Sequence, residues 1–111
     1  MELPTGYEYI ETKNNHFMIR KEGEPREIVL CKIFPKFKEI DVRLLCSRKN
    51  MNVLLHLVEK KALSLDYMRV SVICIGDENL LNLYKTFGFN LISEKPIIMG
   101  QLSIYTMKKN I

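Results

Sequence analysis

Two short segments of this 111-residue chain contain side chains that can move protons. Residues 77–89 read Asp-Glu-Asn-Leu-Leu-Asn-Leu-Tyr-Lys-Thr-Phe-Gly-Phe and place one tyrosine, Tyr84, inside a helical pattern. Glu39 and Asp41 are two residues apart in an alternating segment, so both carboxylates point to the same face of a strand. A phenol can donate a proton and a carboxylate can accept one. These residues are the first candidates for acid–base chemistry; the alternative for Glu39 and Asp41 is a pair of carboxylates that simply faces solvent.

The tyrosine segment has the start and stop signals of a helix. Asp77 can cap the N-terminus by accepting free backbone N–H groups, and Gly88 can adopt the left-handed conformation that ends a helix. We therefore predict a helix over residues 78–87 and a strand from Phe89 onward. The apolar positions follow the spacing i, i+3, i+4, i+7 and predict one buried face, formed by Leu80, Leu83, Tyr84 and Phe87. The alternative role for Tyr84 is simple packing in the core.

A second, longer helix is predicted over residues 50–65. Its apolar face is formed by Met51, Leu54, Leu55, Val58, Ala62 and Leu65. Ser47 or Asn50 can cap its start, and Asp66-Tyr67 ends it.

The remaining segments have the composition of strands. We predict strands at residues 7–11, 16–20, 28–34, 39–45, 68–75, 89–93 and 102–107, with turns at residues 13–15 and 22–25. Within the fourth strand, Ile40, Val42 and Leu44 are expected on one side. The fifth strand is almost continuously apolar, which predicts a strand covered on both faces.

The resulting order is ββββ-α-β-α-ββ, an α/β (α+β) chain forming a single domain over residues 1–111. A strand, a crossover helix and a second strand imply a parallel pair within a mixed, mostly antiparallel sheet of about six or seven strands. No interdomain linker or internal repeat is visible.

Composition limits the class of protein. The chain is 47% apolar and has no run of about 18 apolar residues, so we expect a globular domain without a membrane span. We read no secretory signal at the N-terminus and expect a cytoplasmic protein. The three cysteines lack CxxC spacing, and Cys31 and Cys74 lie in apolar runs, which favours buried thiols over a metal site. The net charge of +4 is scattered, which argues against nucleic-acid binding and suits a phosphorylated cofactor or an acidic partner.

The residues Asp77, Leu83-Tyr84 and Gly88-Phe89 resemble the C-terminal half of GCN5-related N-acetyltransferases (GNAT). Members of that family show an Asn or Asp followed by a helix reading roughly Leu-Tyr-x-x-x-Gly-Phe. The predicted element order over residues 39–108 is also that of the acyl-CoA N-acyltransferase fold. The family usually has one or two helices between its first two strands, and here only Lys13-Asn14-Asn15 separates them.

The resemblance implies an acetyl-CoA-dependent transfer of an acetyl group to an amine, supplied by a small molecule or a protein. It implies Tyr84 as the acid that protonates the departing thiolate, and Glu39 or Asp41 as the base. Cofactor contacts would come from the end of the fourth strand, the following loop and the start of the second helix: Leu44, Leu45, Ser47, Arg48, Lys49, Asn50, Asn52, Asp77 and Asn79.

One part of the chain departs from the family pattern. The loop that binds pyrophosphate reads Arg or Gln, two residues, Gly, one residue, then Gly or Ala, whereas residues 46–52 contain no glycine. Asn50 and Asn52 tolerate left-handed backbone better than most residues, and Arg48 and Lys49 offer positive charge. Either these groups replace the glycine loop, or Arg48 and Lys49 are only solvated.

A second, more distant resemblance points to a non-catalytic protein. Val53-Leu54-Leu55, Val72-Ile73-Cys74 and Tyr105-Thr106 resemble ornithine decarboxylase antizyme, which also lacks the glycine loop. This resemblance implies an inactive binding module, a protein inhibitor or adaptor, as the alternative to an enzyme. Open sheet edges are compatible with a monomer or a homodimer.

Overall fold

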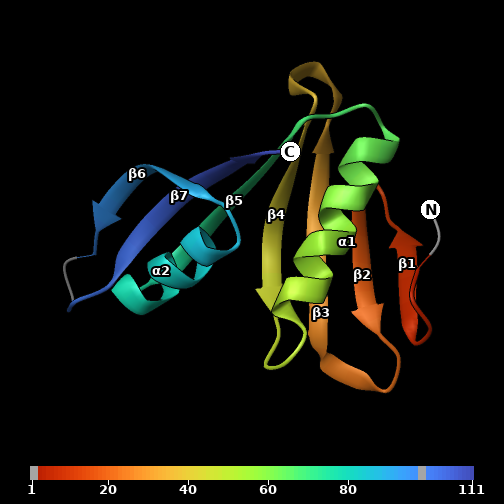
Figure 1. Cartoon of the computed structure of the whole chain (residues 1–111), viewed down its shortest axis with the longest axis horizontal. Helices are drawn as coiled ribbons and strands as arrows, with labels where there is room; N and C mark the ends of the chain where they lie inside the picture. Colours follow the sequence, from red (N-terminus) through yellow and green to blue (C-terminus); the bar gives the residue numbers. More distant parts are fainter. Residues whose placement is uncertain (1–2, 98–99) are drawn as a thin grey trace.

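A computed structural model describes residues 3–97 and 100–111. These residues form a seven-stranded sheet and two α-helices (Figure 1). The elements in chain order are β1 (Tyr7–Glu11), β2 (His16–Lys21), β3 (Glu24–Phe34), a 3-10 turn (Pro35–Phe37), β4 (Glu39–Cys46), α1 (Met51–Ser64), β5 (Arg69–Gly76), α2 (Glu78–Thr86), β6 (Asn90–Pro96) and β7 (Ser103–Asn110).

The sheet has the predicted mixed topology. Its spatial order is β1-β2-β3-β4-β5-β7-β6. β4 and β5 run parallel, joined by the α1 crossover, and every other neighbouring pair is antiparallel. The predicted fold class and element order are therefore confirmed, with element ends shifted by one to three residues in most cases.

Both helices lie on one face of the sheet, where they cover the core (Figure 1). α1 packs over β2, β3, β4 and β5, and α2 contacts β5. The core side chains include Phe17, Ile19, Val29, Cys31, Ile40, Val42, Leu54, Leu57, Val58, Val70, Val72, Tyr105 and Met107. Leu57, which was not assigned to the apolar face, is buried with its neighbours.

The helix ends follow the predicted local chemistry. The Asp77 carboxylate accepts hydrogen bonds from the backbone N–H groups of Asn79 (2.9 Å) and Leu80 (3.3 Å), and Gly88 has φ = 91°. α1 ends because Asp66 adopts φ = 60° and the Tyr67 N–H reaches back to the Ala62 carbonyl at 2.9 Å. At the start of α1 the N-cap residue is Asn50, whose side chain makes no capping hydrogen bond, and Ser47 Oγ accepts from the Asn50 N–H at 3.0 Å in the loop before the helix.

The opposite face of the sheet has no helix over it in the described part of the chain. β2 follows β1 after a turn at residues 12–15, in which Asn14 and Asn15 both have φ = 61°. Ile73 and Ile75 of β5 are consequently 52% and 60% exposed. The prediction that this strand is covered on both faces was wrong, because its apolar run faces the core only at alternate residues.

A β-bulge corrects the predicted face of β4. Leu30 pairs with Leu44 and the next residue of β3, Cys31, pairs with Val42, so Arg43 is an extra residue on β4. The bulge reverses the alternation. Ile40 and Val42 face the core, whereas Leu44 lies on the other face and is 53% exposed.

The turn before β3 and the lengths of the two helices complete the description of the fold. The predicted turn over residues 22–25 is shorter, because β3 begins at Glu24 and includes Pro25. Within the described residues, 3–97 and 100–111, neither helix has the length and apolar composition needed to cross a membrane.

Candidate functional site

The parallel strands β4 and β5 pair along only half of their length. Their register runs from Glu39 opposite Arg69 to Val42 opposite Val72. Beyond that point β4 continues to Cys46 beside β3, and β5 continues to Gly76 beside β7. The two strands are therefore bonded to different neighbours where they separate, and a cleft of about 410 Å³ opens between them.

The cleft is mainly apolar and α2 forms one side of it. It is lined by Val42, Arg43, Leu44, Leu45, Ser47, Met51, Val72, Ile73, Cys74, Ile75, Leu80, Leu83 and Tyr84. The single buried face predicted for α2 is corrected here. Leu81 is the leucine packed into the core at 7% exposure, and Leu83 borders the cleft at 42% exposure.

Tyr84 is the ionisable side chain most enclosed at this cleft. It is 3% exposed and its ring meets Phe89 edge to face, with centroids 5.6 Å apart. Burial, together with the nearby Cys74 thiol, raises the pKa of Tyr84 above its ordinary value of 10.0. The hydroxyl therefore keeps its proton at neutral pH. Tyr84 packs in the core and also borders the cleft, and its role as an acid stays a prediction.

Glu39 and Asp41 lie on the helix-free face, where they form a buried polar cluster. Their exposures are 8% and 7%, and Ser71 Oγ lies 2.7 Å from Asp41 Oδ1 and 3.2 Å from Glu39 Oε2. Arg43 Nε pairs with Asp41 Oδ2 at 2.9 Å, and Lys108 Nζ lies 3.2 Å from Glu39 Oε1. Two carboxylates are thus held together by basic side chains and one hydroxyl.

This carboxylate cluster borders a second hollow, of about 290 Å³. Arg43 and Ile73 line both this hollow and the cleft. The two cavities therefore adjoin at the edge where β4 and β5 separate, with Tyr84 in one and Glu39 and Asp41 in the other.

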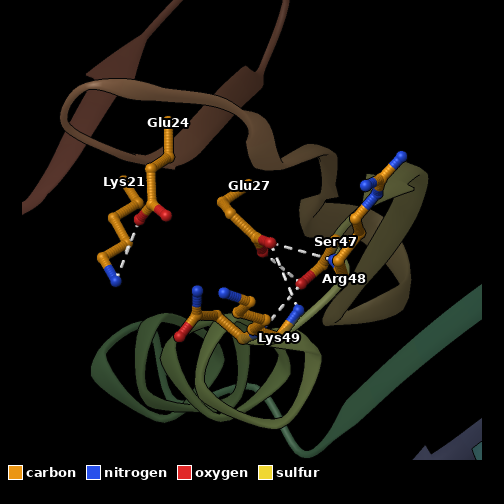
Figure 2. Close-up of polar contacts among 7 residues, drawn as sticks. Lys21, Glu24, Glu27, Ser47, Arg48 and Lys49 are labelled. Atoms are coloured by element: carbon orange, nitrogen blue, oxygen red, sulfur yellow. Dashed lines mark hydrogen bonds and ion pairs between the residues drawn. The ribbon is translucent and has the colours of Figure 1, made fainter.

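The loop before α1 is organised by a residue that sequence reasoning missed. Glu27 of β3 is 5% exposed, and its carboxylate accepts hydrogen bonds from Ser47 Oγ and from the backbone N–H groups of Arg48 (2.9 Å) and Lys49 (3.2 Å). These bonds, Ser47 first, lower the pKa of Glu27 to about 2. Figure 2 shows Glu27 pointing into the loop, while the Arg48 side chain points away from it.

The loop does not use the left-handed backbone that a glycine-rich loop permits. Asn50 has φ = −118°, and Asn52 lies within α1. Arg48 and Lys49 are exposed and line a shallow groove with Arg26 and Glu27. The N–H groups of Arg48 and Lys49 in this loop already donate to the Glu27 carboxylate.

The structure divides the predicted cofactor residues into three places. Leu44, Leu45 and Ser47 line the cleft with Tyr84, and Arg48 and Lys49 lie at the Glu27 groove. Asp77 and Asn79 are engaged in capping α2 and do not line the cleft. Within residues 3–97 and 100–111, no cluster of His, Cys, Asp or Glu has the composition of a metal site.

Comparison with known proteins identifies the fold. No family model matches the sequence, and no curated protein matches it either. Solved structures do match. An aminoglycoside 6′-N-acetyltransferase solved with coenzyme A superposes with a TM-score of 0.72 at 12% identity, over 88% of this chain and 74% of that one. A Bacillus anthracis protein provisionally assigned as a streptothricin acetyltransferase was solved with acetyl coenzyme A. It superposes with a TM-score of 0.69 at 10% identity, over 100% of this chain and 70% of that one.

The similarity extends over most of this chain but over less of its neighbours. Nourseothricin acetyltransferase matches with a TM-score of 0.66 at 11% identity, over 86% of this chain and 64% of that one. The chain therefore spans about two thirds to three quarters of the length of these proteins. Sequence identities this low establish architecture alone, and the chain has the fold of the GCN5-related N-acetyltransferases.

Proposed function

We propose that this chain is an N-acetyltransferase that takes its acetyl group from acetyl-CoA in the cleft between β4 and β5. The observation that supports this most is the end of β4–β5 pairing at Val42 and Val72, which opens an apolar cleft beside Tyr84. Such a cleft can admit an extended acyl-pantetheine arm between two strands. The thioester supplies an activated acetyl group when it is bound.

The side chains of the cleft have two tasks. Leu45, Val72 and Leu83 exclude water from the arm, since apolar walls give no hydrogen-bond partners to solvent. Tyr84 provides the proton for the leaving thiolate. Its raised pKa suits a donor that must remain protonated until a thiolate forms beside it.

The acceptor amine is proposed to enter from the helix-free face. The 290 Å³ hollow there holds both carboxylates and adjoins the cleft at Arg43 and Ile73. We assign the base to Asp41, because it lies one residue before the end of β4–β5 pairing, with Glu39 as the more distant alternative. A water between Asp41 and the amine can relay the proton.

The experiment is a calorimetric titration with acetyl-CoA, supported by thermal melting. Leu83→Glu places a charge on the apolar wall and should abolish the heat of binding and the rise in melting temperature. Leu63→Glu is the matched control, because Leu63 is an exposed leucine of α1 (55%) that does not line the cleft. Equal binding by both variants would place the cofactor elsewhere and contradict the proposal.

A binding module without cofactor is the second candidate. Leu44, Ile73 and Ile75 give the helix-free face an apolar surface that a protein partner could cover, and each is more than half exposed. Absence of acetyl-CoA binding by the unmodified chain, with the fold intact, would favour this candidate.

A further inference from the structure

An internal anion lies in the loop directly before α1, which begins at Met51. The backbone N–H groups of Arg48 and Lys49 donate to the Glu27 carboxylate, and the Asn50 N–H donates to Ser47 Oγ, which itself donates to Glu27. Three successive N–H groups are therefore engaged within the chain. A phosphate at a helix N-terminus is bound by free backbone N–H groups, and this carboxylate lies immediately beside the place where such a phosphate would bind.

This carboxylate is firmly held. Glu27 comes from β3, twenty residues or more before its partners, and it is almost completely buried. The donors are mostly backbone groups fixed by the fold, and the positive end of the α1 dipole favours an anion at this place. The depressed pKa of Glu27 means that the group is ionised throughout the neutral range.

A second anion at the same place meets two obstacles. A pyrophosphate bound through the loop would compete with Glu27 for the N–H groups of Arg48 and Lys49, and one bound at the first turn of α1 would be repelled by the neighbouring carboxylate. Releasing Glu27 instead would leave a buried carboxylate without its partners. The side chains of Arg26, Arg48 and Lys49 are exposed, so salt screens their attraction for an anion.

We propose that Glu27 takes the place of the donor's pyrophosphate, so that this chain recognises the acyl-pantetheine arm and not the nucleotide of coenzyme A. The inference rests on the proposed function, because it concerns the acyl donor of the same cleft. The substrate class is an acyl thioester of pantetheine, bound along the apolar walls between β4 and β5. The missing glycines are then expected, since no phosphate approaches the backbone of residues 47–50.

The test compares two donors by calorimetry at 0.15 M salt, acetyl-CoA and S-acetylpantetheine, with inorganic pyrophosphate as the probe of the loop. The unmodified chain should bind the two thioesters with dissociation constants within about threefold of each other and should not bind pyrophosphate. Glu27→Ala frees the loop N–H groups, so it should tighten acetyl-CoA binding about tenfold or more, leave S-acetylpantetheine unchanged and create pyrophosphate binding. Glu27→Gln removes the charge alone and should produce a smaller gain.

Glu24→Gln is the matched control, because Glu24 lies on the same strand but pairs with Lys21 and not with the loop (Figure 2). A tenfold preference of the unmodified chain for acetyl-CoA would overturn the inference while upholding the proposed function. Binding of neither thioester to any variant would instead overturn the proposed function itself. If the Glu27 variants do not fold, the affinities of the unmodified chain for acetyl-CoA, S-acetylpantetheine and pyrophosphate still test whether the nucleotide is recognised.

Discussion

Strands β4 and β5 pair over their first halves and separate over their second halves, and these two regions differ in bonding and in polarity. In the paired half, residues 39–42 bond to residues 69–72, and the helix-free face there is filled by ion-paired carboxylates. In the separated half, residues 44–46 pair with β3 and residues 73–76 pair with β7, and an apolar cleft lies between the two strands. The bulge at Arg43 lies at the boundary between them.

The paired half of β4 and β5 stabilises the sheet, and the separated half provides the space for a ligand. Ladder hydrogen bonds and the Glu39–Asp41 cluster stabilise the first half, whereas the second half gives up ladder bonds for space. Substitutions in the paired half should therefore act mainly on stability, except at the proposed base, and substitutions in the separated half should act mainly on binding and turnover.

The largest effect is expected at Tyr84, in the separated half. Tyr84→Phe should lower acetyl transfer about 10²-fold or more, the scale of losing a general acid, while changing the free energy of unfolding by about 1 kcal/mol or less. Because burial raises the pKa of Tyr84 above its ordinary value of 10.0, any acetyl transfer by the unmodified chain should not fall through deprotonation of Tyr84 at pH values below 10. Steady-state kinetics across pH and chemical denaturation provide the two readouts.

Tyr84→Ala is the complementary variant, because it removes the packed ring as well. It should cost about 3–5 kcal/mol of stability, as for other large buried aromatic side chains. Unchanged turnover in Tyr84→Phe, with loss of stability only in Tyr84→Ala, would reduce Tyr84 to a packing residue.

Asp41, the proposed base, is the residue of the paired half whose replacement should also lower acetyl transfer. Asp41→Asn should lower turnover about 10²-fold with little change in donor affinity, because it removes a proton acceptor and leaves the cleft unaltered. Glu39→Gln, two residues further from the opening, should lower turnover much less. Equal small losses in both variants would assign the cluster to structure alone.

Ser71 should report on stability alone. Ser71→Ala removes the hydroxyl that lies between the two buried carboxylates, and it should cost about 1–3 kcal/mol, measured by chemical denaturation. Donor affinity should not change. Ser64→Ala is a suitable control, because the exposed Ser64 hydroxyl bonds only to the Lys61 carbonyl and its loss should be within about 0.5 kcal/mol.

The smallest effect is expected beyond the end of β4. Combined Arg48→Ala and Lys49→Ala should weaken acetyl-CoA binding about two- to threefold at low salt and not at all at 0.5 M salt, because both side chains are solvated. Replacing Lys36 and Lys60 together controls for the loss of two positive charges. A large loss that persists at high salt would show direct phosphate contact.

Much of the fold could be predicted because its signals are local. The Asp77 cap and Gly88 stop each depend on residues within a few positions, and the change from alternating to helical spacing after β4 marked α1. Element order and strand count followed from these signals. The face of Leu44 could not be predicted, because the extra residue at Arg43 is defined only by pairing with β3.

The candidate site was less accessible to sequence reasoning. Tyr84, Leu44, Leu45 and Ser47 were placed at the cleft by resemblance, yet Glu27 was not considered. Its signal was faint: one carboxylate beside the apolar run that begins at Ile28. What makes Glu27 matter is the approach of β3 to a loop some twenty residues later, and no short-range pattern encodes that contact.

The four-residue turn between β1 and β2 also has a consequence for the order of folding. β1 to β4 are joined by short connections, so their three hairpin pairings close small loops at low entropic cost. The β4–β5 seam must instead wait for the whole α1 crossover, and it gains only a half-length ladder on closing. We therefore expect the N-terminal meander to form before the cleft, an order that φ-value measurements on β2–β3 and on β4–β5 would test.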